Sequence, residues 1–130
     1  MKKPRLGLVL SFALSSVAFA QAAPASAASA PAAAKNLFAV EIRTGPQWNA
    51  ALAPGQQPLM REHSANLRKL RDEGRIRIGA RYGEVGLVVL EAATIEEARA
   101  WMEADPAMRA GTFRFEIHPF SVFYAGVVGR

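Results

Sequence analysis

The first regular pattern along the chain is an alternation of apolar and polar positions over residues 36–44. Every second side chain is apolar, so this stretch is expected to be a strand with one fully apolar face, formed by Phe38, Val40 and Ile42. Residues 45–58 carry glycine and proline at both ends, which is typical of a loop. Within it we expect Trp48 to pack the loop against the domain, because an aromatic ring gains most from burial. Stacking on a ligand is the alternative interpretation.

The period becomes helical over residues 59–73. One stripe recurs at the spacing of a helix face and consists of Leu59, His63, Leu67 and Leu70. The remaining positions are mostly charged and predict a solvated face. Gly74 suits the left-handed residue at which helices commonly end. His63 is thus a polar side chain that we expect to face inward.

Two further strands are expected at residues 75–82 and 86–92. The turn between them is short and contains glycine, which predicts a hairpin. The second of these strands is apolar on both sides, as in a central strand.

A second helix is expected over residues 94–105, because Thr94 and Glu97 have the spacing of a capping box. This helix ends at Asp105, since a residue before proline is pushed out of the helical conformation. Alternation resumes in residues 112–120, which predicts a last strand.

The expected order is therefore strand, helix, strand, strand, helix, strand. This order predicts an α+β, ferredoxin-like fold with one antiparallel sheet and both helices on one face. We expect the covered face to carry Phe38, Val40, Ile42, Ile76, Ile78, Phe113, Phe115 and Ile117. The opposite face should carry a mixed set, namely Leu37, Ala39, Glu41, Arg75, Arg77, Arg114, Glu116 and His118. Such a face is either exposed to solvent or packed against the same face of a second subunit, so that the two enclose a polar chamber. We favour the homodimer.

The N-terminal segment reads as an export signal. Residues 1–20 combine a basic start, an apolar run and a small-residue cleavage site. The apolar run is shorter than the roughly 20 residues that span a bilayer, so we expect cleavage and no stable membrane anchor. Residues 21–35, rich in alanine, proline and serine, are expected to form a disordered linker ahead of a domain at 36–130. These features predict a periplasmic or secreted protein.

Composition limits the partners. The chain has no cysteine, so packing alone must hold the exported fold. Its formal charge is +5, but three basic residues leave with the signal, so 16 − 3 = 13 basic residues face 11 acidic ones. A mature charge of +2 argues against nucleic acid as a partner. The sequence has no metal-binding histidine motif, no glycine-rich phosphate loop and no cysteine nucleophile, so we predict neither metal nor cofactor.

Two stretches together resemble the YCII-related family of the dimeric α+β barrel superfamily. They are "REHSANLRKLRDEGRI" and "GLVVLEAATIEEARAWMEADPAMRAGTFRFEIHPF", and the resemblance covers about residues 37–120. The family's proposed histidine–aspartate active site falls here on His63 and Asp105. The resemblance also implies two subunits packed sheet against sheet. The chain departs from the family pattern at Ala80–Arg81 and at Ala107, so either the substrate differs or activity is lost.

Each candidate residue has a plainer interpretation beside the functional one. His63 is either a core histidine with satisfied hydrogen bonds or a general base oriented by Asp105, since histidine titrates near neutrality. Asp105 either caps the following turn or holds His63, and the two roles are compatible. His118 is either a surface or interface residue or part of a dimer cavity.

Three hypotheses about activity follow. The first is a proton-transfer lyase, isomerase or hydrolase for a small organic molecule, with His63 as base and Asp105 as its orienter. An anionic substrate would be attracted by Arg75, Arg77 and Arg81, with His118 as a further substrate-binding candidate. The second is a non-catalytic small-ligand-binding module, and the third is a structural dimeric domain.

Overall fold

The computed structural model describes residues 7, 35–127 and 129. The predicted signal peptide, apart from Gly7, and the predicted linker up to residue 34 lie outside the described residues. Within the described part of the chain, no helix is long and apolar enough to cross a membrane.

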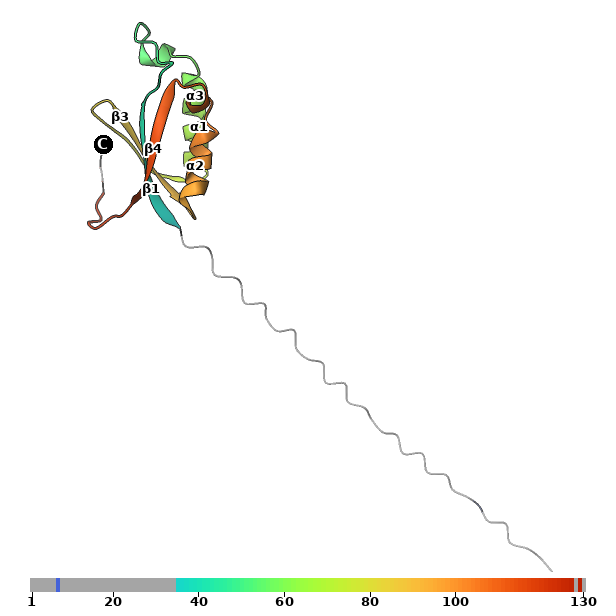
Figure 1. Ribbon diagram of the computed structural model, residues 1–130. Coiled ribbons are helices and arrows are strands. Elements are labelled where there is room, and N and C mark those ends of the chain that lie inside the picture. The colour runs from blue at the N-terminus through green and yellow to red at the C-terminus, as the bar shows by residue number, and fades with distance from the viewer. Residues whose placement is uncertain (1–6, 8–34, 128, 130) are drawn as a thin grey trace, which may run out of the picture. The chain divides into compact units, whose positions relative to one another are not determined.

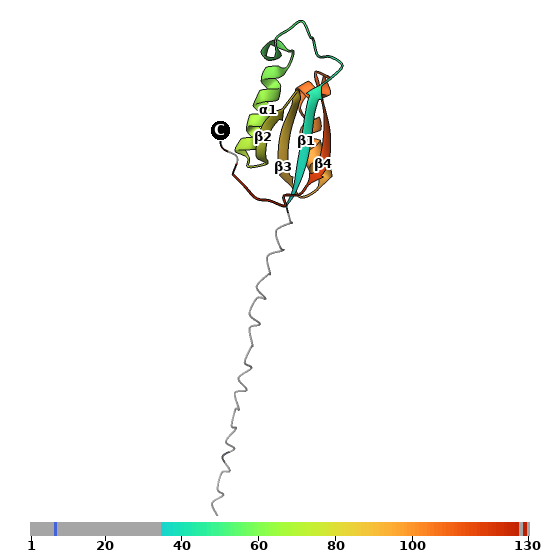
Figure 2. The same ribbon diagram turned by 90° about the vertical axis from the view of Figure 1, so that its left-hand side faces the viewer.

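One antiparallel sheet has the strand order β2-β3-β1-β4. Its strands are β1 (Asn36–Thr44), β2 (Ile76–Tyr82), β3 (Val85–Ala92) and β4 (Phe113–Phe120). The helices are α1 (Met60–Asp72), α2 (Ile95–Glu103) and the short α3 (Pro106–Arg109), with one 3-10 turn, η1 (Pro54–Gln56). Figure 1 shows α1, α2 and α3 together on one side of the sheet, and Figure 2 looks onto the uncovered side. The predicted ferredoxin-like α+β fold is confirmed.

The core lies between the helices and the covered face of the sheet. The alternation of β1 buries every second side chain, because hydrophobic free energy favours removing these apolar surfaces from water. The central cluster consists of Phe38, Val40, Ile42, Val88, Leu90, Ala92, Ala98, Met102 and Ile117. Trp101 packs at its edge.

The expectation for Ile78 is wrong. A β-bulge at Arg77 puts one extra residue between Ile76 and Ile78, so Ile76 pairs with Leu90 and Ile78 pairs with Val89. Because side chains alternate, the bulge moves Ile78 to the uncovered face. There it is 41% exposed.

The helix ends follow local chemistry. Gly74 has φ = +72°, which ends α1 as predicted. Leu59 is not helical but precedes α1 in a left-handed conformation, so the helix starts one residue later than expected. At α2 the Thr94 side chain accepts the Glu97 N–H as expected, whereas the Glu97 carboxylate accepts from the N–H of Ala93.

The loop between β1 and α1 is held by a buried polar side chain. Gln57 is 4% exposed, and its amide bonds the backbone of Asn49 and Leu52 across the loop. The loop is also fastened at its start, because the N–H of Gly45 donates to the carbonyl of Thr112 at 2.8 Å. These contacts fix the position of Trp48, which lies between them.

Candidate functional site

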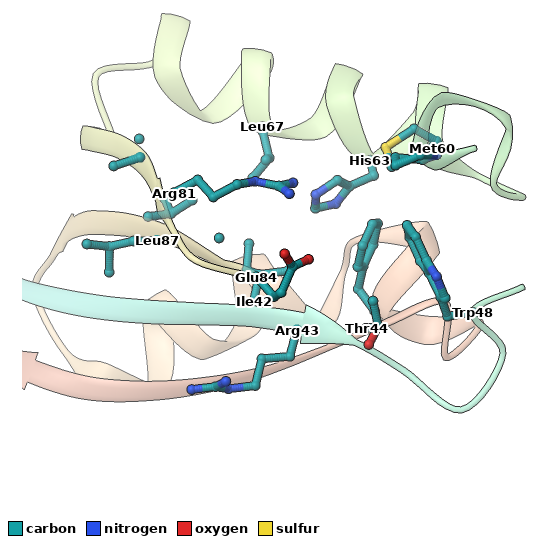
Figure 3. A pocket seen from close by; sticks show the side chains of 16 residues that line it. Ile42, Arg43, Thr44, Trp48, Met60, His63, Leu67, Arg81, Glu84 and Leu87 are labelled. Carbon is teal, nitrogen blue, oxygen red and sulfur yellow. The ribbon is translucent and has the colours of Figure 1, made fainter. Parts of the chain in front are cut away.

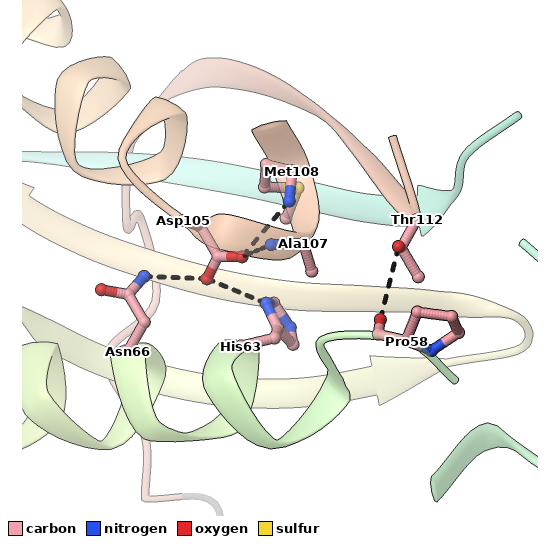
Figure 4. Close-up of polar contacts among 7 residues, drawn as sticks. All are labelled: Pro58, His63, Asn66, Asp105, Ala107, Met108 and Thr112. Atoms are coloured by element: carbon pink, nitrogen blue, oxygen red, sulfur yellow. Dashed lines mark hydrogen bonds and ion pairs between the residues drawn. The ribbon is translucent and has the colours of Figure 1, made fainter. Parts of the chain in front are cut away.

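The structure brings His63 and Asp105 together from two separate helices. His63 lies on the inner stripe of α1, and Asp105 precedes α3. Nδ1 of His63 lies 3.0 Å from Oδ2 of Asp105 (Figure 4). A carboxylate can only accept, so Nδ1 carries the proton of this bond and the neutral ring keeps a lone pair on Nε2.

Asp105 also caps the helix that follows it. Its Oδ1 accepts the N–H groups of Ala107 and Met108, at 2.9 and 3.3 Å. Pro106 needs no such acceptor, because it has no N–H. The two roles considered for Asp105 therefore coexist in one carboxylate, with one oxygen for the cap and the other for the histidine.

Asn66 is a third member of this network, and the sequence pattern did not predict it. Its Nδ2 donates to Oδ2 of Asp105 at 2.8 Å. Asn66 follows His63 by three residues, so the two side chains share a helix face. That spacing was the available signal, but only the position of Asp105 in space gives it meaning.

The carboxyl group of Asp105 has no exposed surface. Burial alone raises its pKa, but the hydrogen bond and charge of His63, with the bonds from Asn66 and the Met108 N–H, outweigh burial and hold the pKa below its usual value. The group is therefore a carboxylate at neutral pH and a fixed acceptor for His63.

His63 borders a cavity of about 470 Å³ between α1, the β2–β3 hairpin and the end of β1 (Figure 3). That volume is within the usual range for small-molecule sites. The cavity is lined by Ile42, Arg43, Thr44, Trp48, Pro54, Met60, His63, Leu67, Gly79, Ala80, Arg81, Glu84, Gly86, Leu87, Val88 and Phe113.

Two glycines leave room for this cavity. Gly79 pairs with Val88, and Gly86 pairs with Ile42, so both fall on the covered face of the sheet. An added Cβ at Gly79 would meet no atom within 4 Å. Bulky side chains at these positions would occupy space that the structure leaves open beneath α1.

Aromatic rings form one wall of the cavity. The ring of His63 lies 4.8 Å from that of Phe113, which lies 5.5 Å from that of Trp48. Trp48 packs its loop onto β4 through this contact, as expected, and it also lines the cavity. The sequence did not separate these two roles, because one half-buried ring serves both.

Of the four predicted substrate-binding residues, only Arg81 borders the cavity. The guanidinium of Arg75 lies 4.1 Å from the ring centre of Trp101, on the helix side and not on the uncovered face as expected. Arg77 pairs with Glu91 at 3.4 Å. The His118 side chain is 61% exposed, and its Nε2 lies 3.7 Å from Glu116 on the uncovered face.

No group of three or more histidine or acidic side chains with the geometry of a metal site occurs among residues 7, 35–127 and 129. Ala107, at one departure from the family pattern, is fully buried behind Asp105 and does not line the cavity.

Fold and site together define a small α+β domain with a histidine–carboxylate pair beside a cavity. The YCII-related domain matches residues 44–121, which is more than half of the chain. The chain therefore belongs to the YCII-related family. This confirms the resemblance found in the sequence.

A search of characterised proteins finds no match to this chain. Among solved structures, it is similar to 5-chloro-2-hydroxyhydroquinone dehydrochlorinase from Burkholderia phenoliruptrix AC1100, solved in complex with 2,5-dihydroxybenzoquinone. The identity is 20%, the alignment covers 65% of this chain and 93% of the other, and the TM-score is 0.47.

Proposed function

We propose that the protein is a small-molecule enzyme in which His63 abstracts a proton from an organic acid bound in the cavity. The observation that carries the proposal is the 3.0 Å contact between Nδ1 of His63 and the buried Asp105 carboxylate. This contact leaves Nε2 as the basic nitrogen of a neutral ring that borders the cavity.

The network supports base catalysis in two ways. Asp105 fixes the ring in one tautomer, and its negative charge stabilises the imidazolium that forms when the proton is taken. Asn66 and the cap of α3 in turn fix Asp105. Pre-oriented groups of this kind lower the cost of reaching the transition state.

One part of the remaining lining supports a small anionic substrate. Arg81 supplies a positive charge at the cavity, and the aromatic wall formed by Trp48 and Phe113 offers apolar contact. A proton removed from carbon next to a carboxylate or carbonyl group begins elimination or isomerisation, whereas a proton removed from water produces the nucleophile for hydrolysis. We therefore propose a lyase, isomerase or hydrolase, with binding and no turnover as the alternative outcome.

Solvent deuterium uptake tests proton removal from carbon, the step that elimination and isomerisation share. Phenylpyruvate, acetoacetate and α-angelica lactone would be incubated with the protein in D₂O and followed by proton NMR. We expect exchange of one acidic C–H to be accelerated by the wild type. His63→Gln should lower the rate at least about 100-fold, the size typical of a general base.

The chain's other histidine provides the matched control. His118→Gln makes the same substitution at a position on the uncovered face. It should leave the deuterium exchange rate within about twofold of the wild-type rate. Equal rates for wild type and His63→Gln would contradict the assigned role. Thermal stabilisation by one compound without any exchange would select the binding module instead.

We also propose that the working protein is exported and dimeric. The N-terminal signal pattern supports export to the periplasm or beyond. The uncovered sheet face supports a homodimer, because it exposes Ile78 and Tyr82 beside charged side chains. Fractionation of cells that express the full chain would contradict export if the protein stayed uncleaved in the cytoplasm.

A further inference from the structure

The β2–β3 hairpin brings two side chains of opposite charge to the same cavity. Arg81 lies near the end of β2, and Glu84 lies in the turn that follows it. Figure 3 shows the guanidinium of Arg81 and the carboxylate of Glu84 both directed toward the space beside His63. Glu84 took no part in the function inferred from the sequence.

Neither charge is paired with another side chain in the described part of the chain. Within residues 35–127, no salt bridge or side-chain hydrogen bond joins Arg81 or Glu84 to another residue. Other charged side chains of the sheet and its ends do form ion pairs, as Arg75 does with Glu73 and Arg77 with Glu91. Both members of the hairpin pair are thus free to bind a ligand.

The two charges require different groups on the ligand. A guanidinium binds a carboxylate, often through two parallel N–H bonds. A carboxylate only accepts, so Glu84 requires a donor such as a hydroxyl group. The apolar wall formed by Trp48 and Phe113 borders the same space and suits a ring or another bulky apolar body.

From this arrangement we infer that the cavity selects hydroxy acids with an apolar body, which Arg81 and Glu84 recognise together. The carboxylate contacts Arg81, the hydroxyl donates to Glu84, and the body lies against the aromatic wall. A C–H beside the carboxylate then faces the ring of His63. The inference rests on the proposed function, because it names the substrate class of the same cavity.

Four probes separate these contributions. 3-Phenyllactate carries all three features, whereas lactate lacks the ring, 3-phenylpropanoate lacks the hydroxyl, and 1-phenylpropan-2-ol lacks the carboxylate. Isothermal titration calorimetry on the wild-type protein should show 3-phenyllactate binding about tenfold or more tightly than each of the others, the scale of one hydrogen bond to a charged group.

Two substitutions assign the preference to side chains. Glu84→Ala should bring 3-phenyllactate and 3-phenylpropanoate to equal affinity, and Arg81→Gln should do the same for 3-phenyllactate and 1-phenylpropan-2-ol. Arg61→Gln and Glu96→Ala remove exposed charges that do not line the cavity, and both should retain the wild-type preferences.

Three binding results would overturn the hydroxy-acid inference. It fails if the wild type does not bind 3-phenyllactate, if the wild type does not prefer 3-phenyllactate, or if Glu84→Ala leaves the hydroxyl preference intact. Deuterium exchange is the independent readout. If the wild type prefers 3-phenyllactate but His63→Gln leaves the deuterium exchange rate unchanged, only the proposed function is overturned. If exchange depends on His63 but the wild type shows no preference for 3-phenyllactate, only the hydroxy-acid inference is overturned.

Discussion

Asp105 is the residue on which the candidate site depends most. Its two oxygens accept from the His63 ring, the Asn66 amide and two backbone N–H groups, and the carboxylate itself is fully buried. Proline after it fixes the backbone, so the carboxylate is held in one position. The hydrogen bonds that support the structure here are therefore the same ones that orient the proposed base, His63.

Removal of this carboxylate should destabilise the fold. Asp105→Ala leaves buried donors unpaired, and we expect the free energy of unfolding to fall by about 3 kcal/mol. Urea denaturation followed by circular dichroism measures the change. Asp72→Ala is the matched control, because Asp72 is exposed and pairs with exposed Arg71, and it should change stability by less than about 0.5 kcal/mol.

The Asp105 carboxyl group also makes the stability of the fold depend on pH. The pKa of Asp105 is lower in the folded state than in the unfolded chain, where an aspartate titrates at about 3.9. Its contribution is therefore present above about pH 4 and is lost as the pH falls further, through the folded pKa. The stability difference between wild type and Asp105→Asn, measured in urea from pH 7 to pH 2.5, should shrink below pH 4. A difference that stays constant would contradict the assigned ionisation.

At the residue scale, the sequence predicts the members of the pair but not their setting. His63 stands out because it is polar on an apolar stripe, and Asp105 because an acid precedes proline. Asn66 shares a helix face with His63, but neither Asn66 nor Glu84 stands out from its local pattern in this way. Their importance depends on which side chains approach them from distant segments, which a one-dimensional pattern does not contain.

At the scale of elements, the loop between β1 and α1 is positioned by a close backbone contact. A Cβ at Gly45 would lie 2.1 Å from the carbonyl oxygen of Gly111, so no other residue fits without movement. Gly111 itself has φ = +78°, which favours glycine. This contact fastens the loop that carries Trp48 to the start of β4.

Substitution of Gly45 should therefore disturb both stability and the cavity wall. We expect Gly45→Ala to lower the free energy of unfolding by about 2 kcal/mol, because the overlap displaces backbone rather than a flexible side chain. Gly79→Ala is the matched control, since its Cβ meets no atom within 4 Å. Thermal unfolding of the two variants measures the difference, and equal melting temperatures would contradict it.

The elements themselves follow from local patterns. Strand alternation, the helical stripe of α1 and the capping residues of α2 each act over a few residues, so their order could be predicted. The bulge at Arg77 could not, because it depends on how β2 pairs with β3. The same bulge determines that Ile78 faces away from the helices and that Gly79 and Arg81 face the cavity.

At the scale of the whole molecule, the uncovered sheet face is the surface on which the proposed homodimer would form. Ile78 and Tyr82 are 41% and 47% exposed on this face. Beside them Glu41 accepts hydrogen bonds from Tyr82 and Arg43, and these bonds lower the pKa of Glu41 and raise that of Tyr82. An apolar area next to a satisfied polar cluster is typical of an interface.

A charge placed on this face should separate the proposed dimer. Ile78→Glu would bury an unpaired carboxylate between subunits, and we expect the dimer dissociation constant to rise at least about 100-fold. Sedimentation equilibrium of wild type and variant measures it. Leu52→Glu, on the exposed loop, is the control and should stay dimeric. A monomeric wild type would contradict the dimer itself.

The tautomer of the neutral His63 ring tests the central claim most directly. If Asp105 orients the ring as proposed, the proton is on Nδ1 and Nε2 is the basic nitrogen. Long-range ¹H–¹⁵N correlation spectra would be recorded at a pH where the ring is neutral, with His118→Gln used for assignment. We predict the Nδ1–H tautomer in the wild type and its loss in Asp105→Ala. A ring protonated on Nε2, or a tautomer that does not respond to Asp105→Ala, would show that this carboxylate does not orient the base.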